Sequence, residues 1–167
     1  MSPDKIVISI YNNGEMVDLP TIMPLIKAAY MEEEGRNAVL PNRYEQQLRE
    51  ALQSQNNLRI IVASIKEKAV GLSFCFLHPE PAIGGRTLEL QDLVVLPSWR
   101  GKGIGTRLMA ETEAVAAREG CKKIILSVSV DNPIGQRLSR KLGYGHCHPP
   151  KYYMEKPLND SLPQQAG

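Results

Sequence analysis

The segment Leu93–Thr106, LVVLPSWRGKGIGT, contains residues whose types and spacing suit the binding of a diphosphate. Three glycines within five positions let the backbone curl around a ligand without clashes from Cβ atoms. These glycines and the two neighbouring cations are Gly101, Gly103, Gly105, Arg100 and Lys102. An amphipathic helix is expected to follow, and the unpaired N–H groups and positive dipole end at its start favour an anion.

Three other interpretations of this loop are a Walker loop, a dinucleotide-binding fingerprint and a structural turn. A Walker loop requires Ser or Thr after Gly-Lys, and here Gly103 follows Lys102, so that interpretation fails. A dinucleotide-binding fingerprint requires a third glycine where this chain has Thr106, and it should follow its strand directly. A turn that only joins strand to helix seldom needs three glycines and two cations. The last two interpretations stay open as minor alternatives.

Two spaced motifs resemble those of the GCN5-related N-acetyltransferase (GNAT) family. Arg100-x-x-Gly103-x-Gly105 matches the pattern [R/Q]-x-x-G-x-[G/A], between a strand ending in Val-x-Pro and a long helix. The stretch Asn132–Tyr144, NPIGQRLSRKLGY, resembles the second signature, N-x-x-A-x-x-L-Y-x-K-x-G-F. Two motifs in the right order are more specific than either alone, so the chain is identified as a member of this family.

The resemblance implies acetyl-CoA as cosubstrate, bound where two parallel strands splay apart. Loop amides would hold the pyrophosphate, strand main-chain groups would pair with pantetheine, and Asn132 would contact the pantetheine arm. The residues so implied are Leu93, Val94, Val95, Arg100, Gly101, Lys102, Gly103, Ile104, Gly105, Thr106, Asn132 and Ser139. The Leu93 amide would polarise the thioester carbonyl as an oxyanion donor.

An amine must lose a proton before it attacks the thioester, so a base is required. Histone-type members of the family carry their base at the position of Glu89, and strand alternation is expected to place Glu89 and Leu93 on one face. A half-exposed structural glutamate is the alternative. Gln91 occupies the position of the glutamate in polyamine-type members, which disfavours a polyamine substrate. Asp92 is expected on the opposite face in a structural role.

The group that protonates the leaving thiolate is the weakest part of the resemblance. The family usually has a tyrosine at the position of Ser139, which could hydrogen-bond the sulfur but is a poor proton source. Tyr144, Tyr152 or water would then act instead. A plain helix-face hydroxyl is the alternative for Ser139.

These features predict an acetyl-CoA-dependent N-acetyltransferase that acts on a primary amine by direct attack in a ternary complex. We expect a small-molecule acceptor. A protein N-terminal or lysine acetyltransferase is the alternative within this class. A non-catalytic acyl-CoA-binding sensor is the alternative from another class, because the family tyrosine is missing at Ser139.

The hydrophobic periodicity predicts an α/β (α+β) fold of GNAT type, with four helices around a mixed, mostly antiparallel sheet of about seven strands. Helices are expected after an N-cap at Asp18, from near Asn42, over 103–119 and after an N-cap at Asn132. The expected strands are 6–11, 58–65, 70–77, 88–96, 124–130, 144–147 and 151–155. The cofactor splay is expected between 88–96 and 124–130.

Composition limits the remaining possibilities. The 167 residues fit one domain, expected over 1–156, with a flexible tail over 157–167. Twenty Lys and Arg against 18 Asp and Glu give a net charge of +2, too little to indicate nucleic acid or an anionic membrane as the main partner. Without the long apolar run of a signal peptide, we expect a cytoplasmic protein, with a homodimer as one possible assembly. The three cysteines form no zinc signature, so no metal is expected.

Overall fold

The computed structural model describes residues 5–13, 17–53, 55–156 and 158. The chain divides into two compact units, Met1–Ser127 and Val128–Gly167. The tail expected over 157–167 lies outside the described residues, apart from Leu158. Each unit is described by itself.

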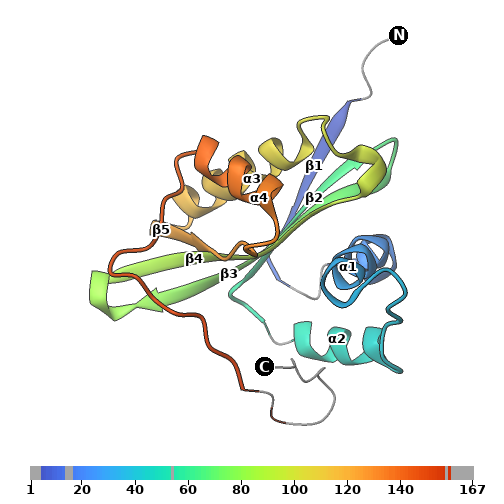
Figure 1. The fold of residues 1–167 in the computed structure, drawn as a ribbon, viewed down its shortest axis with the longest axis horizontal. Coiled ribbons are helices and arrows are strands. Elements are labelled where there is room, and N and C mark those ends of the chain that lie inside the picture. The colour runs from blue at the N-terminus through green and yellow to red at the C-terminus, as the bar shows by residue number, and fades with distance from the viewer. Residues whose placement is uncertain (1–4, 14–16, 54, 157, 159–167) are drawn as a thin grey trace. The chain divides into compact units, whose positions relative to one another are not determined.

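The first unit is a five-stranded sheet with three helices (Figure 1). Its strands are β1 (Ile6–Tyr11), β2 (Leu58–Ile65), β3 (Lys68–Glu80), β4 (Gly85–Val95) and β5 (Cys121–Leu126). Its helices are α1 (Leu19–Glu34), α2 (Tyr44–Leu52) and α3 (Ile104–Arg118). The strands lie in sequence order; β1 to β4 are antiparallel and β5 is parallel to β4. The second unit contains α4 (Pro133–Lys141).

The core of the first unit has two sides because the central strands are apolar on both faces. Leu58, Ile60 and Leu72 face α1, where they join Ile22 and Leu25 in one buried cluster. Residues of the opposite parity face α3, whose buried face carries an apolar stripe. The buried residues of α3 are Ile104, Leu108, Met109, Thr112, Val115 and Ala116. The alternation and helical spacing seen in the sequence therefore correspond to real core faces.

The prediction of about seven strands was wrong: the described residues form five. Residues 144–147 and 151–155 are not in strands, and β5 ends at Leu126 instead of continuing to 130. A strand exists only where its backbone groups find a partner strand. Pro149 and Pro150, which have no N–H to donate, separate the two predicted C-terminal strands.

An irregularity in β4 changes which side chains share a face. Cys75 pairs with Leu90, but the next residue back along β3, Phe74, pairs with Asp92. Gln91 is therefore the extra residue of a β-bulge. Because side chains alternate strictly along a strand, one inserted residue exchanges the faces of everything that follows it.

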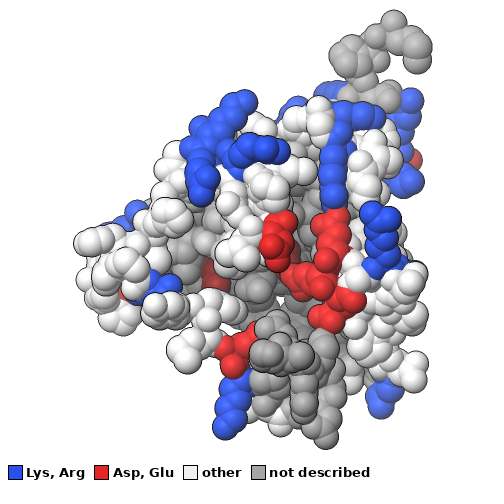
Figure 2. Space-filling model, in the orientation of Figure 1, with Lys and Arg blue, Asp and Glu red and all other residues white. Residues whose placement is uncertain are grey.

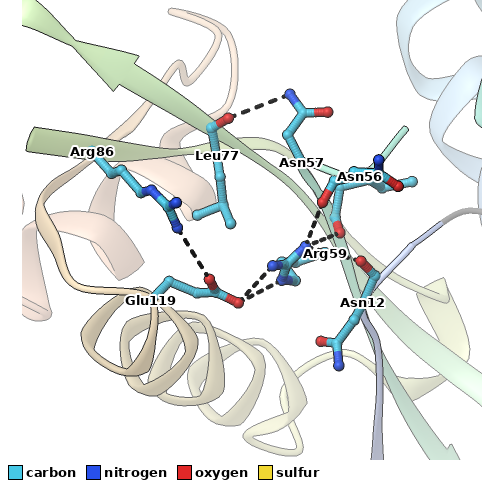
Figure 3. A network of polar contacts seen from close by, with 8 residues as sticks. Asn12, Asn56, Asn57, Arg59, Leu77, Arg86 and Glu119 are labelled. Atoms are coloured by element: carbon cyan, nitrogen blue, oxygen red, sulfur yellow. Dashed lines mark hydrogen bonds and ion pairs between the residues drawn. The ribbon is translucent and has the colours of Figure 1, made fainter. Parts of the chain in front are cut away.

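A polar network fastens the end of α3 to the sheet (Figure 3). Glu119, which follows α3, accepts from Arg59 of β2 at 2.7 Å and lies 3.6 Å from Arg86 of β4. Arg59 also donates to the main-chain carbonyl of Asn12 at 2.9 Å. Because Arg59 is 12% exposed and Glu119 24%, water screens this pair only partly. The network therefore fixes the C-terminal end of α3 against β2 and β4.

Candidate functional site

The glycine-rich loop joins β4 to α3 and contains two residues in the left-handed backbone conformation. A single 3₁₀ turn, Pro97–Trp99, follows the strand. Gly101 and Gly103 then adopt left-handed conformations, with φ of 74° and 78°, and α3 begins at Ile104. Residues with a Cβ atom rarely adopt this backbone conformation, so glycine is needed at both positions.

The loop presents a row of main-chain N–H groups without protein acceptors. The first N–H of α3 to be paired is that of Arg107, which donates to the Gly103 carbonyl at 3.0 Å. Within the described residues, the N–H groups from Gly101 to Thr106 donate to no protein atom. A Cβ added at Gly101 or Gly103 would meet no atom within 4 Å, so space beside the backbone is open. Such a row of donors at a helix start fits an anion such as a diphosphate.

The two cations of the loop are positioned by neighbours in the same unit. Arg100 donates to the Val95 carbonyl at 2.9 Å and forms an ion pair with Glu32 at the end of α1. Lys102 lies over the ring of Trp99, with 4.4 Å from its Nζ to the ring centroid. Arg100 therefore ties α1 to the end of β4, and Lys102 adds its positive charge beside the row of amides.

The C-terminal part of β4 leaves one side open. Pairing of β4 with β5 stops at Leu90 and Leu126, while β4 continues to Val95. The resemblance implied two strands that splay apart here, whereas in the structure pairing stops because β5 itself ends at Leu126. Leu96 donates its N–H to Val70 of β3, so the alternate residues Leu93 and Val95 direct their main-chain groups away from β3. The Leu93 N–H thus faces the open side, as an oxyanion donor would require.

The expectation that Glu89 and Leu93 share a face was wrong. Glu89 lies opposite Phe76 on β3, whereas Leu93 lies opposite Ser73, whose side chain has the other parity. The β-bulge at Gln91 causes this reversal. Glu89 Oε2 is 2.8 Å from His78 Nε2, so the carboxylate that was expected as the base has a partner within its own hairpin.

The same bulge brings Asp92, expected on the opposite face, to the face of Glu89. There it lies in a pocket of about 200 Å³ between α1, α2 and the sheet. The lining is apolar and aromatic apart from two carboxyl groups. The lining residues are Ile26, Ala29, Tyr30, Glu33, Tyr44, Leu48, Leu72, Phe74, Asp92 and Val94.

Burial governs the electrostatics of this pocket. It raises the pKa of Asp92. Burial is also the main cause that raises the pKa of Glu33, with smaller contributions from the charges of Asp92 and Glu34. The pKa of the Tyr44 hydroxyl is raised first by burial and then by Asp92. Figure 2 shows acidic side chains gathered where Figure 1 draws α1. The pocket is therefore a place where a bound cation would replace lost solvation.

Three predicted site residues belong to the second unit. Asn132 accepts a hydrogen bond from the Gly135 amide at 2.9 Å, so its expected role as the N-cap of α4 is confirmed. The Ser139 hydroxyl donates to the Gly135 carbonyl at 3.0 Å, as a helix-face hydroxyl does. The Ser139 carbonyl in turn accepts from the Tyr144 amide at 3.0 Å. Contacts of these residues with a cofactor stay predictions.

The described residues offer neither a metal-binding cluster nor a helix that could cross a membrane. No group of three or more His, Cys, Asp or Glu side chains is arranged to hold a metal ion. None of the helices in the described part combines the length and the apolar character needed to cross a bilayer.

Sequence reasoning missed Asp92 as a pocket residue, together with Tyr30 and Tyr44. A signal for Asp92 was present: the apolar positions of this strand shift from Leu88 and Leu90 to Leu93, a spacing of three that strict alternation does not allow. The two tyrosines had no such signal, because they come from different helices that meet only in the fold.

The sequence is similar to those of known acetyltransferases. A model of the family described as "Acetyltransferase (GNAT) family" matches residues 22–144. An aminoglycoside N(6')-acetyltransferase type 1 of Acinetobacter genomosp. 13 is 27% identical over 130 residues, which are 74% of this chain and 89% of the relative. A thialysine N-epsilon-acetyltransferase of Mus musculus is 37% identical over 59 residues, which span only 35% of its length and 35% of this chain.

The fold has solved counterparts as well. The structure of aminoglycoside N-acetyltransferase AAC(6')-Iy in complex with CoA has a TM-score of 0.73 to this chain. The match covers 94% of this chain and 100% of the other, at 19% sequence identity. At that identity the likeness concerns the fold.

Proposed function

The chain belongs to the acetyltransferase (GNAT) family and is an acyltransferase, and from this premise we propose that it transfers the acetyl group of acetyl-CoA to the primary amine of a small molecule. Transfer is direct, in a ternary complex of enzyme, acetyl-CoA and amine. The family model extends from α1 to just beyond α4, which supports residues 1–156 as one acetyltransferase domain.

The observation that carries this proposal is the row of unpaired amides from Gly101 to Thr106 at the start of α3. These donors hold the pyrophosphate of CoA, and the charge of Lys102 adds to their attraction. Glycine at positions 101 and 103 keeps the approach to the backbone free of side chains.

The open side of β4 supports the second part of the site. Main-chain groups of Leu93, Val94 and Val95 lie on the strand whose pairing with β5 has stopped, and the pantetheine arm adds there like a strand. Acetyl-CoA supplies an activated acyl group, a thioester. The Leu93 N–H, directed to the open side, stabilises the negative charge that develops on the acyl oxygen.

The acceptor class rests on two supports. The relative from Acinetobacter genomosp. 13 is named for acetylating aminoglycosides, which are small polycationic amines. The pocket beside β4 has about 200 Å³ and two carboxyl groups, dimensions and charges that suit a compact cationic amine. We therefore place the acceptor in this pocket.

The remaining catalytic roles are carried forward as proposals. Glu89 is one candidate for the group that takes the proton of the amine. Ser139 hydrogen-bonds the leaving sulfur once its hydroxyl turns away from the Gly135 carbonyl, and Tyr144 or water protonates the sulfur. A thiol has a pKa of about 8.5, so its thiolate is a good leaving group and this last step needs little help.

Release of CoA thiol tests the proposal. The protein is incubated with acetyl-CoA and a panel of amines that includes aminoglycosides, diamines, amino sugars and a peptide with a free α-amine. We expect thiol release that depends on a small amine. Release with the peptide alone would indicate a protein acetyltransferase, and tight CoA binding without turnover would indicate an acyl-CoA sensor.

A further inference from the structure

Asp92 occupies a position that joins the pocket to the reacting end of β4. Its side chain lines the pocket, while the next residue along the strand, Leu93, directs its N–H to the open side of the sheet. Asp92 therefore directly precedes, in the chain, the amide proposed to face the acyl oxygen. The bulge at Gln91 creates this arrangement, since without the bulge Asp92 would face α3.

The pocket contains negative charge without a compensating cation. Its titratable lining groups are Tyr30 and Glu33 from α1, Tyr44 from α2 and Asp92 from β4, while β3 contributes only Leu72 and Phe74. Among the described residues, Asp92 and Glu33 take part in no ion pair or hydrogen bond. The nearby Glu32, by contrast, is paired with Arg100. The two pocket carboxylates are left for a cationic ligand.

We propose that Asp92 is the catalytic base of the reaction and that Glu33 holds the ammonium group of the acceptor beside it. The inference rests on the proposed function and replaces Glu89 in one role. An N–H bond of the ammonium breaks and its proton moves to a carboxylate oxygen of Asp92. The freed lone pair forms the C–N bond to the acetyl carbon, and the C–S bond breaks with its electron pair on sulfur. The nitrogen, positively charged after this attack, loses its second proton to solvent to give the neutral amide, and the thiolate takes a proton from solvent.

The lining also specifies the class of acceptor. Three aromatic residues, Tyr30, Tyr44 and Phe74, line the same pocket as the two carboxylates, and aromatic faces attract cations. A primary ammonium on a compact carbon skeleton satisfies both features. A neutral amide carries no positive charge, and the carboxylate of a zwitterionic amino acid would be repelled by Asp92 and Glu33. The pocket therefore selects cationic primary amines over both.

Glu89 is less well placed for proton transfer. Its carboxylate is 2.8 Å from His78, and Glu89 is not among the residues that line the pocket. Burial raises the pKa of Asp92 and so brings it closer to neutral pH, which makes a carboxylate a more effective base.

The test compares Asp92→Asn with Glu89→Gln in rate against pH, using the best amine from the panel. Loss of a general base costs about 10²–10⁴-fold in rate. For Asp92→Asn we expect kcat at neutral pH to fall at least about 100-fold, and the acidic limb of the rate–pH profile to disappear. The affinity for CoA should not change. The loss should shrink near the pKa of the amine, where free amine needs no base. Asp92→Glu, which keeps the carboxylate, should restore part of the rate.

Glu33→Gln tests the binding half. Because Glu33 contacts the ammonium in ground state and transition state alike, we expect KM for the amine to rise about tenfold with little change in kcat. Glu113→Gln, at an exposed position of α3 remote from the pocket lining, is the matched control and should match wild type.

The outcomes separate the two claims. If wild type releases no thiol with any amine, the proposed function fails and this inference fails with it. If wild type is active but Asp92→Asn keeps its rate and pH profile, or if Glu89→Gln alone abolishes the acidic limb, only the assignment of Asp92 is overturned. An unchanged KM in Glu33→Gln overturns the role of Glu33.

Discussion

At the scale of single residues, the Asp92 carboxylate occupies a position that disfavours its charged form. Asp92 is half-buried among aromatic and aliphatic side chains, and burial disfavours its charged form. Carboxylates with a perturbed pKa are common at functional sites, where the charge binds a ligand or takes part in catalysis. Here the described residues of the free protein provide no cation to pair with Asp92, so a cationic ligand would do so. The residue that weakens the fold is therefore the one that we assign to the chemistry.

This cost predicts how Asp92→Asn changes stability. The folded pKa of Asp92 is raised above its ordinary value of 3.8, so the native state binds the proton more tightly than the unfolded state. The free energy of unfolding therefore falls as the pH rises from 3.8 through the folded pKa of Asp92. Above the folded pKa, the full cost of the buried charged carboxylate is present. We expect Asp92→Asn to melt at a higher temperature than wild type at pH 7, by a margin that shrinks toward pH 4.

Calorimetric or fluorescence melting of both proteins across this pH range checks the prediction. Glu113→Gln, a surface substitution, should change the melting temperature little. A lower melting temperature for Asp92→Asn at pH 7 would mean that the folded protein stabilises the charged carboxylate.

Residue identity alone could not assign the faces of β4. Glu89, Asp92 and Leu93 are all legible in the sequence, but their relative direction depends on whether a bulge intervenes. Gln91 has no special backbone preference that would mark it as the bulged residue. Only the shift in the apolar positions, from Leu88 and Leu90 to Leu93, carried that information.

At the scale of elements, α3 is held at both ends by different means. The glycine loop sets its start, and Glu119 fastens its end to two strands through Arg59 and Arg86 (Figure 3). A carboxylate shared by two guanidinium groups and partly shielded from water is worth more than an exposed ion pair. The end of α3 therefore depends on one side chain.

Glu119→Gln should accordingly destabilise the protein. Hydrogen bonds to charged groups contribute about 1.5–3 kcal/mol, and glutamine keeps one weaker contact to Arg59, so we expect a loss of about 1–2 kcal/mol. Urea unfolding measures it, with Glu113→Gln on the same helix as control. Equal midpoints for the two variants would show that the network contributes little.

Elements with strong local signals were predictable, and elements that depend on a partner were not. The alternating apolar residues of β3 and the stripe of α3 predicted both elements correctly, and Asn132 correctly marked the start of α4. The C-terminal strand predictions failed because short apolar stretches such as 151–155 also occur outside sheets. Strand pairing is a long-range property that local composition does not determine.

At the scale of the whole molecule, the net charge of +2 conceals a separation of charge. Unpaired amides and Lys102 gather at the start of α3, whereas Asp92 and Glu33 gather in the pocket. We propose that this separation directs an anionic cosubstrate and a cationic acceptor to different places of the first unit. The family and the loop proposed to bind the cofactor could be predicted from two motifs, but the pocket proposed for the acceptor is visible only in the fold.

Calorimetry with a matched pair of variants tests directly whether the backbone between Arg100 and Thr106 binds the diphosphate of CoA. Gly103 and Gly120 have φ of 78° and 69°, and a Cβ at either would meet no atom within 4 Å. Alanine at each position should therefore cost a similar amount of stability, about 1–2 kcal/mol. Only Gly103 lies in the loop; Gly120 follows the far end of α3.

Wild type and Gly120→Ala should bind CoA with equal affinity, and Gly103→Ala should bind about tenfold or more weakly, which corresponds to about 1.4 kcal/mol. Pantetheine, which lacks the diphosphate, should not distinguish the three proteins. Equal CoA affinity in Gly103→Ala and Gly120→Ala, or no heat with CoA in wild type, would contradict the account.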